Sequence, residues 1–516
     1  MQGYMQRVNK KRAVTPKYVS PKQLSLAGFE TPFERTLNPK NRWVVLAHLI
    51  PWDEVCSIYL KNNPIASTGR PALSPRVIIG SVIIKHLCNL DDIETTAQIS
   101  ENIYMQYFLG YSSFTDEPPF DASLLTDFRK RLGIDQVNAI NERIVMLRAK
   151  FDSQNEKYTD PEQNTPENTG GNESRKIENK GKLIMDATAC PQDIAYPTDL
   201  DLLSNAREKS EQIIDDVYDI SIHKEKPRTY RLVARKRYLQ AAQKKNKSSK
   251  LIRKAVGSQL RFLRRNLTII NRLLDSYPTI PLESKQYRNL LVISTLYNQQ
   301  KQMYDQKIHS VEHRIVSMHQ PHIRPIVRGK SHAKVEFGAK IHVSLIDGIC
   351  FLDQLSWDNF NEGNQMMQYI ENYYKRFGFY PKEVLADKIY CTRANRAALK
   401  LKNIKLIAKP LGRPAAVSNH VRPGERNPIE GKFGQAKTGY GLNRIRARLM
   451  DTSQTWIASI ILVLNLVKLA GLSSLCLIIN TIESFSVKAT LSVLLYIHGF
   501  SVPSRFNSLI IDCEYA

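Results

Sequence analysis

The sequence has 516 residues, 42% of them hydrophobic, which is enough for two or three domains with apolar cores. Lys and Arg number 74 against 49 Asp and Glu, giving a formal charge of +25 that predicts a polyanionic partner, most commonly nucleic acid. None of the seven cysteines forms a CxxC pair, which argues against a zinc site built from local cysteine pairs and suits a reducing cytosol.

Residues 1–150 are expected to form an all-α N-terminal domain for DNA binding or dimerisation. Ser74 is a candidate N-cap, Pro75 suits the first helical position, and Gly133 is a candidate helix stop. Short helices with a basic last member are compatible with a helix-turn-helix module. A small helical bundle that serves dimerisation explains the same pattern. The helices are predicted over 74–90, 91–111 and 121–133.

Residues 151–182 are nearly free of apolar side chains and rich in Asn, Glu, Pro and Gly. Such a segment cannot bury enough surface to offset the entropy that is lost when it becomes ordered. We therefore expect a flexible linker here, and with it a domain boundary.

Residues 183–471 alternate between strand and helix patterns, which predicts an α/β domain with a mixed sheet. Asp347 and Gly348 suit the turn of a hairpin between two of its strands. Strands are predicted over 182–188, 338–348, 349–357, 382–390 and 403–409, and helices over 361–378, from Asn427 and after Thr455.

No membrane partner is expected. The basic N-terminus is not followed by an apolar run, so it does not have the pattern of a signal peptide. The most apolar stretch begins near Trp456, and Asn465 and Lys468 interrupt it, which predicts a buried helix and not a membrane span. The tail, 472–516, is apolar and sparsely charged, and no role is predicted for it.

A basic stretch with helical periodicity, about 205–315, interrupts the order of strands and helices. Within 221–265 there are sixteen Lys or Arg and a single acid, which gives this segment a charge of +15. A solvated helix face usually carries balanced charges, because like charges at i and i+4 repel. The excess therefore predicts a contact with the phosphate backbone of DNA, through residues such as Arg235, Lys236 and Arg237.

Three acids are distinguished by their placement. Asp186 ends the apolar run LIMD, Asp387 ends the run VLAD, and Glu430 stands alone among cations at the start of a helix. An Asp at the end of a buried strand is costly to desolvate unless a partner neutralises it, although an end that faces water is the usual case. With Asn427 as N-cap and Pro428 in the first turn, Glu430 would also suit a capping box. The local sequence is consistent with either role for Glu430.

The placement on two strands and one helix predicts that Asp186, Asp387 and Glu430 converge. Three such carboxylates would repel one another and raise each other's pKa, and two divalent cations would remove that repulsion. Mg²⁺ and Mn²⁺ prefer oxygen ligands. Two such ions about 4 Å apart activate a water or a 3′-hydroxyl and stabilise the leaving oxygen in phosphoryl transfer. We therefore predict that these acids are catalytic and bind two Mg²⁺ or Mn²⁺ ions.

Several motifs, in the correct order, resemble bacterial insertion-sequence DDE transposases, and more narrowly the branch with an InsH-like N-terminal domain. The resemblance covers most of 183–470, and the helices around 70–135 look like that N-terminal domain. It implies a ribonuclease-H-like mixed sheet as the catalytic core, with a large helical insertion between its first and second strands. The motifs are LIMDAT, VEFGAKIHVSLIDG, SWDNFNEGNQ, FGFYPKEVLADKIYCTRANRAALK and NPIEGKFGQAKTGYGLNRIRARL.

The resemblance also implies the roles of individual residues. Acids on the first strand, the fourth strand and a late helix correspond to the three named above. Related families carry a Tyr, Arg, Glu, Lys signature around the last acid, and Arg426 and Lys437 match it, whereas Pro423 stands at the Tyr position. Lys437 lies seven residues after Glu430, about two helical turns, and so shares a face with it. Arg444 is a further candidate contact to DNA.

The implied function is a transposase that binds and cleaves the ends of an insertion sequence and joins the freed 3′-hydroxyl to target DNA. The expected partners are double-stranded DNA, as terminal inverted repeats and as target, and a second copy of the chain, because two ends must be held together. The expected location is the cytoplasm, in association with the nucleoid. The alternatives are a ribonuclease-H-like nuclease or resolvase that cuts without joining, and a catalytically inactive DNA-binding relative.

Overall fold

The computed structural model describes most of the chain between residues 36 and 471. The predicted tail, 472–516, and much of the predicted linker, 159–177, lie outside the described residues. The described ranges are 36–64, 72–158, 178–327, 335–408, 424 and 426–471.

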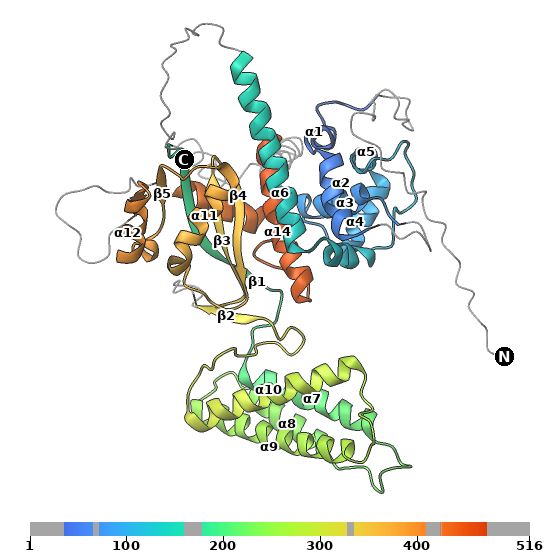
Figure 1. Ribbon diagram of the computed structural model, residues 1–516. Coiled ribbons are helices and arrows are strands. Elements are labelled where there is room, and N and C mark those ends of the chain that lie inside the picture. The colour runs from blue at the N-terminus through green and yellow to red at the C-terminus, as the bar shows by residue number, and fades with distance from the viewer. Residues whose placement is uncertain are drawn as a thin grey trace, which may run out of the picture.

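Within the described ranges, six helices precede the first strand (Figure 1). The single helix predicted over 91–111 is two helices, because Asn102 ends the first and caps the second by accepting a hydrogen bond from the backbone N–H of Tyr104. Pro75 is the first residue of its helix, as predicted, but the side chain of Ser74 makes no capping bond. The helices are α1 (Arg42–Leu49), α2 (Trp52–Asn62), α3 (Pro75–Leu87), α4 (Asp92–Glu101), α5 (Ile103–Leu109) and α6 (Leu124–Tyr158).

Gly133 kinks α6 without ending it. Its φ of 59° and ψ of 168° depart from helical geometry, and a positive φ of this kind is adopted readily only by glycine. The helix continues to Tyr158, so the expected stop at Gly133 is a kink. The first residues of the expected linker, 151–158, are therefore helical.

Trp456 of α14 (Met450–Leu469) contacts residues of the N-terminal helices. Lys85 Nζ and Arg129 Cζ lie 4.7 Å and 5.4 Å from its ring centroid. Asp92 holds both cations, with carboxylate oxygens 2.8 Å from Lys85 Nζ and 2.8 Å from Arg129 Nη2. Residues of α3, α6 and α14 consequently belong to one continuous hydrophobic core.

A mixed sheet forms the centre of the second half of the fold. β1 pairs antiparallel with β3 on one side and parallel with β5 on the other, and β5 pairs parallel with β6. β2 and then β4 pair along the free edge of β3. The predicted hairpin is confirmed as β3 and β4, and Asp347 and Gly348 take positive φ values of 49° and 83° in its turn. The strands are β1 (Lys182–Pro191), β2 (Arg324–Val327), β3 (Val335–Ile346), β4 (Ile349–Ser356), β5 (Glu383–Leu385) and β6 (Lys405–Ile407).

Different helices cover the two faces of the sheet. α11 packs on the face that carries Met185 and Phe351, whereas α14 and α6 pack on the face that carries Val343 and Leu345 (Figure 1). The apolar stretch near Trp456 forms the buried helix α14, as predicted. α14 is long and apolar enough to cross a membrane, but 83% of its most apolar stretch is buried in the fold. The remaining helices of this part are α11 (Met366–Phe377), α12 (Arg393–Leu401) and α13 (Asn427–Gly439).

The predicted insertion is a bundle of helices that lies beside the sheet, at the bottom of Figure 1. It packs around a core of its own, to which Leu203, Leu263 and Leu296 contribute. The range 205–315 contains no strand, as predicted. The helices are α7 (Asp199–Val217), α8 (Arg231–Ala242), α9 (Ser249–Leu274) and α10 (Ser284–Gln306).

Candidate active site

The three predicted acids line one cavity of about 600 Å³. Asp186 lies within β1, Asp387 begins the short 3₁₀ helix η3 (Lys388–Tyr390), and Glu430 lies in the first turn of α13. The structure therefore brings the three side chains together, as the sequence predicts. The predicted strand ends are wrong, because Asp186 lies inside β1 and Asp387 caps η3 two residues after the end of β5. The lining residues are Asp186, Ala187, Thr188, Ala189, Ile326, Val327, Lys340, Asn359, Phe360, Asn361, Glu362, Asp387, Ile389, Arg426 and Glu430.

The register of two parallel strands explains why the aspartates meet. Ile184 of β1 is paired with Leu385 of β5. Asp186 and Asp387 each lie two residues beyond this pair. β5 ends at Leu385 whereas β1 continues to Pro191, and equal spacing from a paired position in parallel strands places the two carboxylates side by side where β5 ends.

Arg426 bridges the two aspartates. Its Nη2 lies 3.0 Å from Asp186 Oδ2, and its Nη1 lies 3.2 Å from Asp387 Oδ1. The residue directly precedes α13, so the helix that carries Glu430 also positions this guanidinium. Arg426 Nε is buried and makes no hydrogen bond within the described residues.

Burial raises the pKa of Asp186, and the negative charges of Asp387 and Glu362 raise it further. The guanidinium of Arg426 and the backbone N–H of Ala187, which donates to Asp186 Oδ1 at 2.8 Å, lower this pKa. The Asp186 side chain is 19% exposed, against 54% for Asp387. The cavity therefore has a buried inner carboxylate and an outer carboxylate that faces solvent.

A fourth acid, Glu362, lines the cavity and was not predicted. Lys340 Nζ lies 2.5 Å from its carboxylate and donates to the carbonyl oxygen of Phe360 at 2.7 Å. Glu362 begins the short 3₁₀ helix η2 (Glu362–Gln365), which is packed against the segment after Asp387, since a side chain at Gly363 would collide with the carbonyl oxygen of Ile389. Glu362 ends no apolar run, so the signal that identified the aspartates is missing.

The donor atoms of this cavity suit hard divalent cations. The acids among the lining residues offer only carboxylate oxygens, which are the ligands that Mg²⁺ and Mn²⁺ prefer. As they stand, no three His, Cys, Asp or Glu side chains in the described part of the chain lie close enough together to hold a metal ion. The residue types therefore fit the predicted ions, and the carboxylates would have to close around them.

Two family models match the chain, one over its N-terminal helices and one over the C-terminal part of the α/β domain. Residues 31–131 match the Transposase domain (DUF772), and residues 384–467 match the Transposase DDE domain. The chain belongs to the DDE transposases. The second match contains Asp387 and Glu430 of this transposase, whereas Asp186 lies before it.

The transposase is also similar to a protein of Rhizobium meliloti described as "Uncharacterized protein ORF8 in nfe locus". The two are 30% identical over 174 residues, which is 33% of this chain and 72% of that relative. No solved structure matches the transposase.

The other predicted DNA contacts of the transposase lie outside the cavity. Lys437 is on α13 but does not line it, and Arg444 pairs with Asp193 through its Nε at 3.0 Å. The three cations of the insertion are exposed on α8, where Arg237 also donates to Ser258 Oγ at 3.4 Å. Arg426 is the predicted cation that contacts Asp186 and Asp387. The three cations of the insertion are Arg235, Lys236 and Arg237.

Helix capping does not account for Glu430 of the transposase. α13 begins at Asn427, so the N-cap position falls on Arg426 and not on Asn427 as expected. No side-chain capping bond is present at this end of the helix. The capping-box explanation of Glu430 is therefore wrong. Glu430 instead lines the cavity that also contains Asp186 and Asp387.

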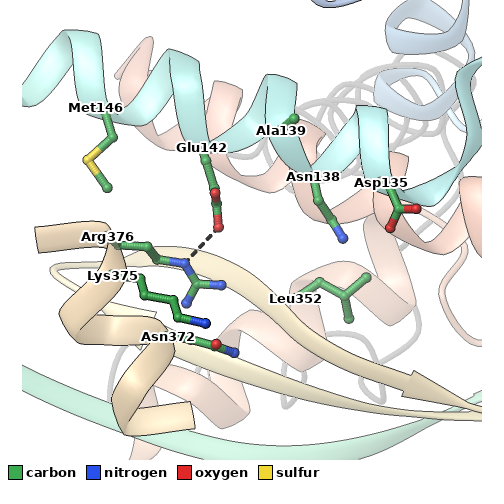
Figure 2. A pocket seen from close by; sticks show the side chains of 9 residues that line it. All are labelled: Asp135, Asn138, Ala139, Glu142, Met146, Leu352, Asn372, Lys375 and Arg376. Carbon is green, nitrogen blue, oxygen red and sulfur yellow. Dashed lines mark hydrogen bonds and ion pairs between the residues drawn. The ribbon is translucent and has the colours of Figure 1, made fainter. Parts of the chain in front are cut away.

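A second cavity, of about 520 Å³, lies between α6 and α11 (Figure 2). Arg376 crosses it and donates to Glu142 Oε1 at 2.7 Å, and it also pairs with the buried Asp353 at 2.8 Å. This arrangement ties α6 to the sheet. None of the predicted site residues is among its lining residues, which are Asp135, Asn138, Ala139, Glu142, Met146, Leu352, Asn372, Lys375 and Arg376.

Proposed function

We propose that this transposase binds the ends of its insertion sequence, cleaves them and joins the freed 3′-hydroxyl to target DNA. The observation that carries the proposal is the shared cavity of Asp186, Asp387 and Glu430 in a chain with a Transposase DDE domain. Acids from three distant segments gain little for the fold by meeting in one cavity, because their charges repel. Their convergence supports a catalytic role.

The order of the strands supports a ribonuclease-H-like core. The hairpin β3–β4 pairs antiparallel with β1, and β5 and β6 follow on the other side of β1 in parallel. Without the short β2, Asp186 lies on the first strand and Asp387 lies two residues after the end of the fourth. Glu430 lies on a later helix, which is the distribution that the resemblance implies.

In the proposed mechanism Asp186, Asp387 and Glu430 hold two Mg²⁺ or Mn²⁺ ions. When bound, such ions supply a nucleophilic oxygen at neutral pH and stabilise the leaving oxygen. Arg426 and Lys437 contact phosphates next to the bond that is cut, and the planar guanidinium of Arg426 suits two-point contact with a phosphate.

The remaining DNA contacts are assigned to surfaces away from the cavity. Arg235, Lys236 and Arg237 on α8 bind the phosphate backbone of the transposon end, Arg444 contacts DNA beside the cavity, and the N-terminal helices contribute to end binding or to dimerisation. Two copies of the chain hold the two ends in a synaptic complex. We place this complex in the cytoplasm, at the nucleoid.

Incubation of the purified chain with its own element's ends, a target plasmid and Mg²⁺ tests the proposal. We expect nicked ends and then joined products, which electrophoresis of labelled DNA separates. Nicks without joined products would support a nuclease or resolvase. Binding with neither product would support an inactive relative.

A further inference from the structure

Arg426 occupies the space between two of the carboxylates that are proposed to bind metal. Each of its Nη atoms contacts a different aspartate, at 3.0 Å and 3.2 Å, and its side chain is only 20% exposed. A guanidinium in this place neutralises part of the charge that a divalent ion would otherwise neutralise. The signature match predicted only that Arg426 contacts a phosphate.

We propose that Arg426 competes with divalent cations for Asp186 and Asp387, so that the site must release this guanidinium before it can hold its ions. The inference rests on the proposed function, because that function makes the two aspartates metal ligands. Arg426 thus pairs with the two aspartates in the metal-free site, and it contacts a DNA phosphate once the site holds its metal ions.

Electrostatic repulsion favours replacement of the Arg426 guanidinium by a divalent cation over simultaneous binding of both to the aspartates. A dication that joined both carboxylates while Arg426 kept its two contacts would lie within a few ångströms of a like charge inside a partly buried cavity, where repulsion is poorly screened. Arg426 Nη2 and Nη1 contact Asp186 Oδ2 and Asp387 Oδ1, so a shared ion that used these two oxygens would meet the guanidinium. The lack of a preformed three-ligand cluster in the described part of the chain agrees with carboxylates arranged around a guanidinium.

Release of Arg426 breaks few contacts. Two Nη contacts to carboxylates hold the guanidinium, and Nε has no hydrogen-bond partner among the described residues. The side chain already lines the cavity in which the DNA phosphate is proposed to lie. A phosphate in that space would offer the two acceptor oxygens that the aspartates give up.

Binding of Mn²⁺ to the free protein tests the proposal without DNA or catalysis. Free Mn²⁺ is measured by electron paramagnetic resonance at pH 7.5 for the wild type, Arg426→Ala and Arg426→Gln. We expect both variants to bind Mn²⁺ roughly tenfold more tightly, as removal of a competitor worth one partly buried ion pair implies. Arg314→Ala is the matched control, since Arg314 is also 20% exposed and pairs with Asp199 at 2.6 Å in the insertion.

A double variant, Asp186→Asn with Arg426→Gln, locates the effect. We expect it to lose the gain in Mn²⁺ affinity, and thermal unfolding verifies that each variant is folded. Unchanged or weaker Mn²⁺ binding by folded Arg426→Gln would overturn the proposal, and so would a gain that survives in the double variant. Failure of the proposed function would appear differently, as wild-type protein that binds Mn²⁺ but does not cut DNA.

Discussion

Asn465 of α14 donates a hydrogen bond from Nδ2 to Asn141 Oδ1 of α6 at 2.8 Å, across 324 residues of sequence. The same amide donates to the carbonyl oxygen of Cys350 at 2.7 Å and accepts from its N–H at 2.8 Å. Both Asn side chains are buried, at 1% and 3% exposure. Asn465, which interrupts the apolar run after Trp456, therefore connects α14 with α6 and with the start of β4.

Asn465→Leu should destabilise the fold by about 3 kcal/mol, because it removes three buried hydrogen bonds, to Asn141 Oδ1 and to the N–H and carbonyl oxygen of Cys350. Asn141 Nδ2 would still donate to the Cys350 carbonyl oxygen, at 3.3 Å. Urea denaturation followed by circular dichroism measures the change. Lys468→Ala, one turn later on the exposed side of α14, is the control and should change the free energy of unfolding by less than about 0.5 kcal/mol. Equal effects of the two changes would mean that the hydrogen bonds of Asn465 contribute nothing.

Asp186→Asn, Asp387→Asn and Glu430→Gln should each reduce cleavage of the element's ends by roughly 10³-fold or more, because each removes a proposed ligand. Affinity for end DNA should stay within a few-fold of the wild type, as measured by fluorescence anisotropy. Glu383→Gln is the control, since Glu383 begins β5 and pairs with Lys405 at 2.9 Å outside the cavity. Near-normal cleavage by any of the three variants would remove that residue from the proposed site.

Neutralising Arg235, Lys236 and Arg237 together, as Gln, should weaken binding to DNA of any sequence. The slope of log affinity against log salt should fall in magnitude by roughly 2 to 3, because each phosphate contact releases about one counterion. A second triple variant at exposed cations elsewhere should leave the slope unchanged. An identical slope for the two triple variants would argue against α8 as a backbone contact. The control positions are Lys375, Lys382 and Lys400.

Asp92, which pairs with Lys85 and Arg129 beside Trp456, should make the stability of the fold sensitive to acid. Burial of Asp92 raises its pKa, but hydrogen bonding to Arg129 and the charges of Lys85 and Arg129 outweigh this and lower the pKa of Asp92 to about 2. Because this value is below the unfolded value of about 4, ionised Asp92 stabilises the fold at neutral pH. This contribution should be lost as the pH falls from about 4 to about 2.

Asp92→Asn tests this acid sensitivity. The variant should be less stable than the wild type by about 2 kcal/mol at pH 7, and the difference should shrink below pH 4 as wild-type Asp92 becomes protonated. Denaturation curves measured between pH 2 and pH 7 follow the difference. Asp116→Asn, in the exposed loop after α5, serves as the control. A stability difference that does not change with pH would contradict the assignment to Asp92.

Local signals in the sequence were enough for many elements of this fold. Asp347 and Gly348 identify their hairpin because few residues other than Gly, Asn and Asp accept a positive φ. Asp186 and Asp387 are visible because acids are rare at the ends of apolar runs. Asn102 shows the opposite case, since the apolar periodicity of 91–111 continues through it although Asn is a common N-cap residue, and here it caps α5.

Contacts that depend on how the elements pack together could not be predicted from local patterns in the sequence. Glu362 and Lys340 come from a short 3₁₀ helix and a strand whose sequences give no sign that they meet at the cavity. Arg426 was predicted to touch phosphate, but its bridge between two aspartates depends on the register of β1 with β5 and on the start of α13. Such contacts follow from how elements pack, which periodicity and composition do not encode.

The packing of α14 against α3 and α6 has a consequence for how the protein is made. The apolar surfaces of helices synthesised first stay uncovered until the ribosome has passed residue 469, nearly four hundred residues after α3 leaves it. A product that terminates within the sheet would lack Trp456 and the rest of that cover. The half of the protein that is proposed to bind DNA therefore matures only together with the half that is proposed to cut it.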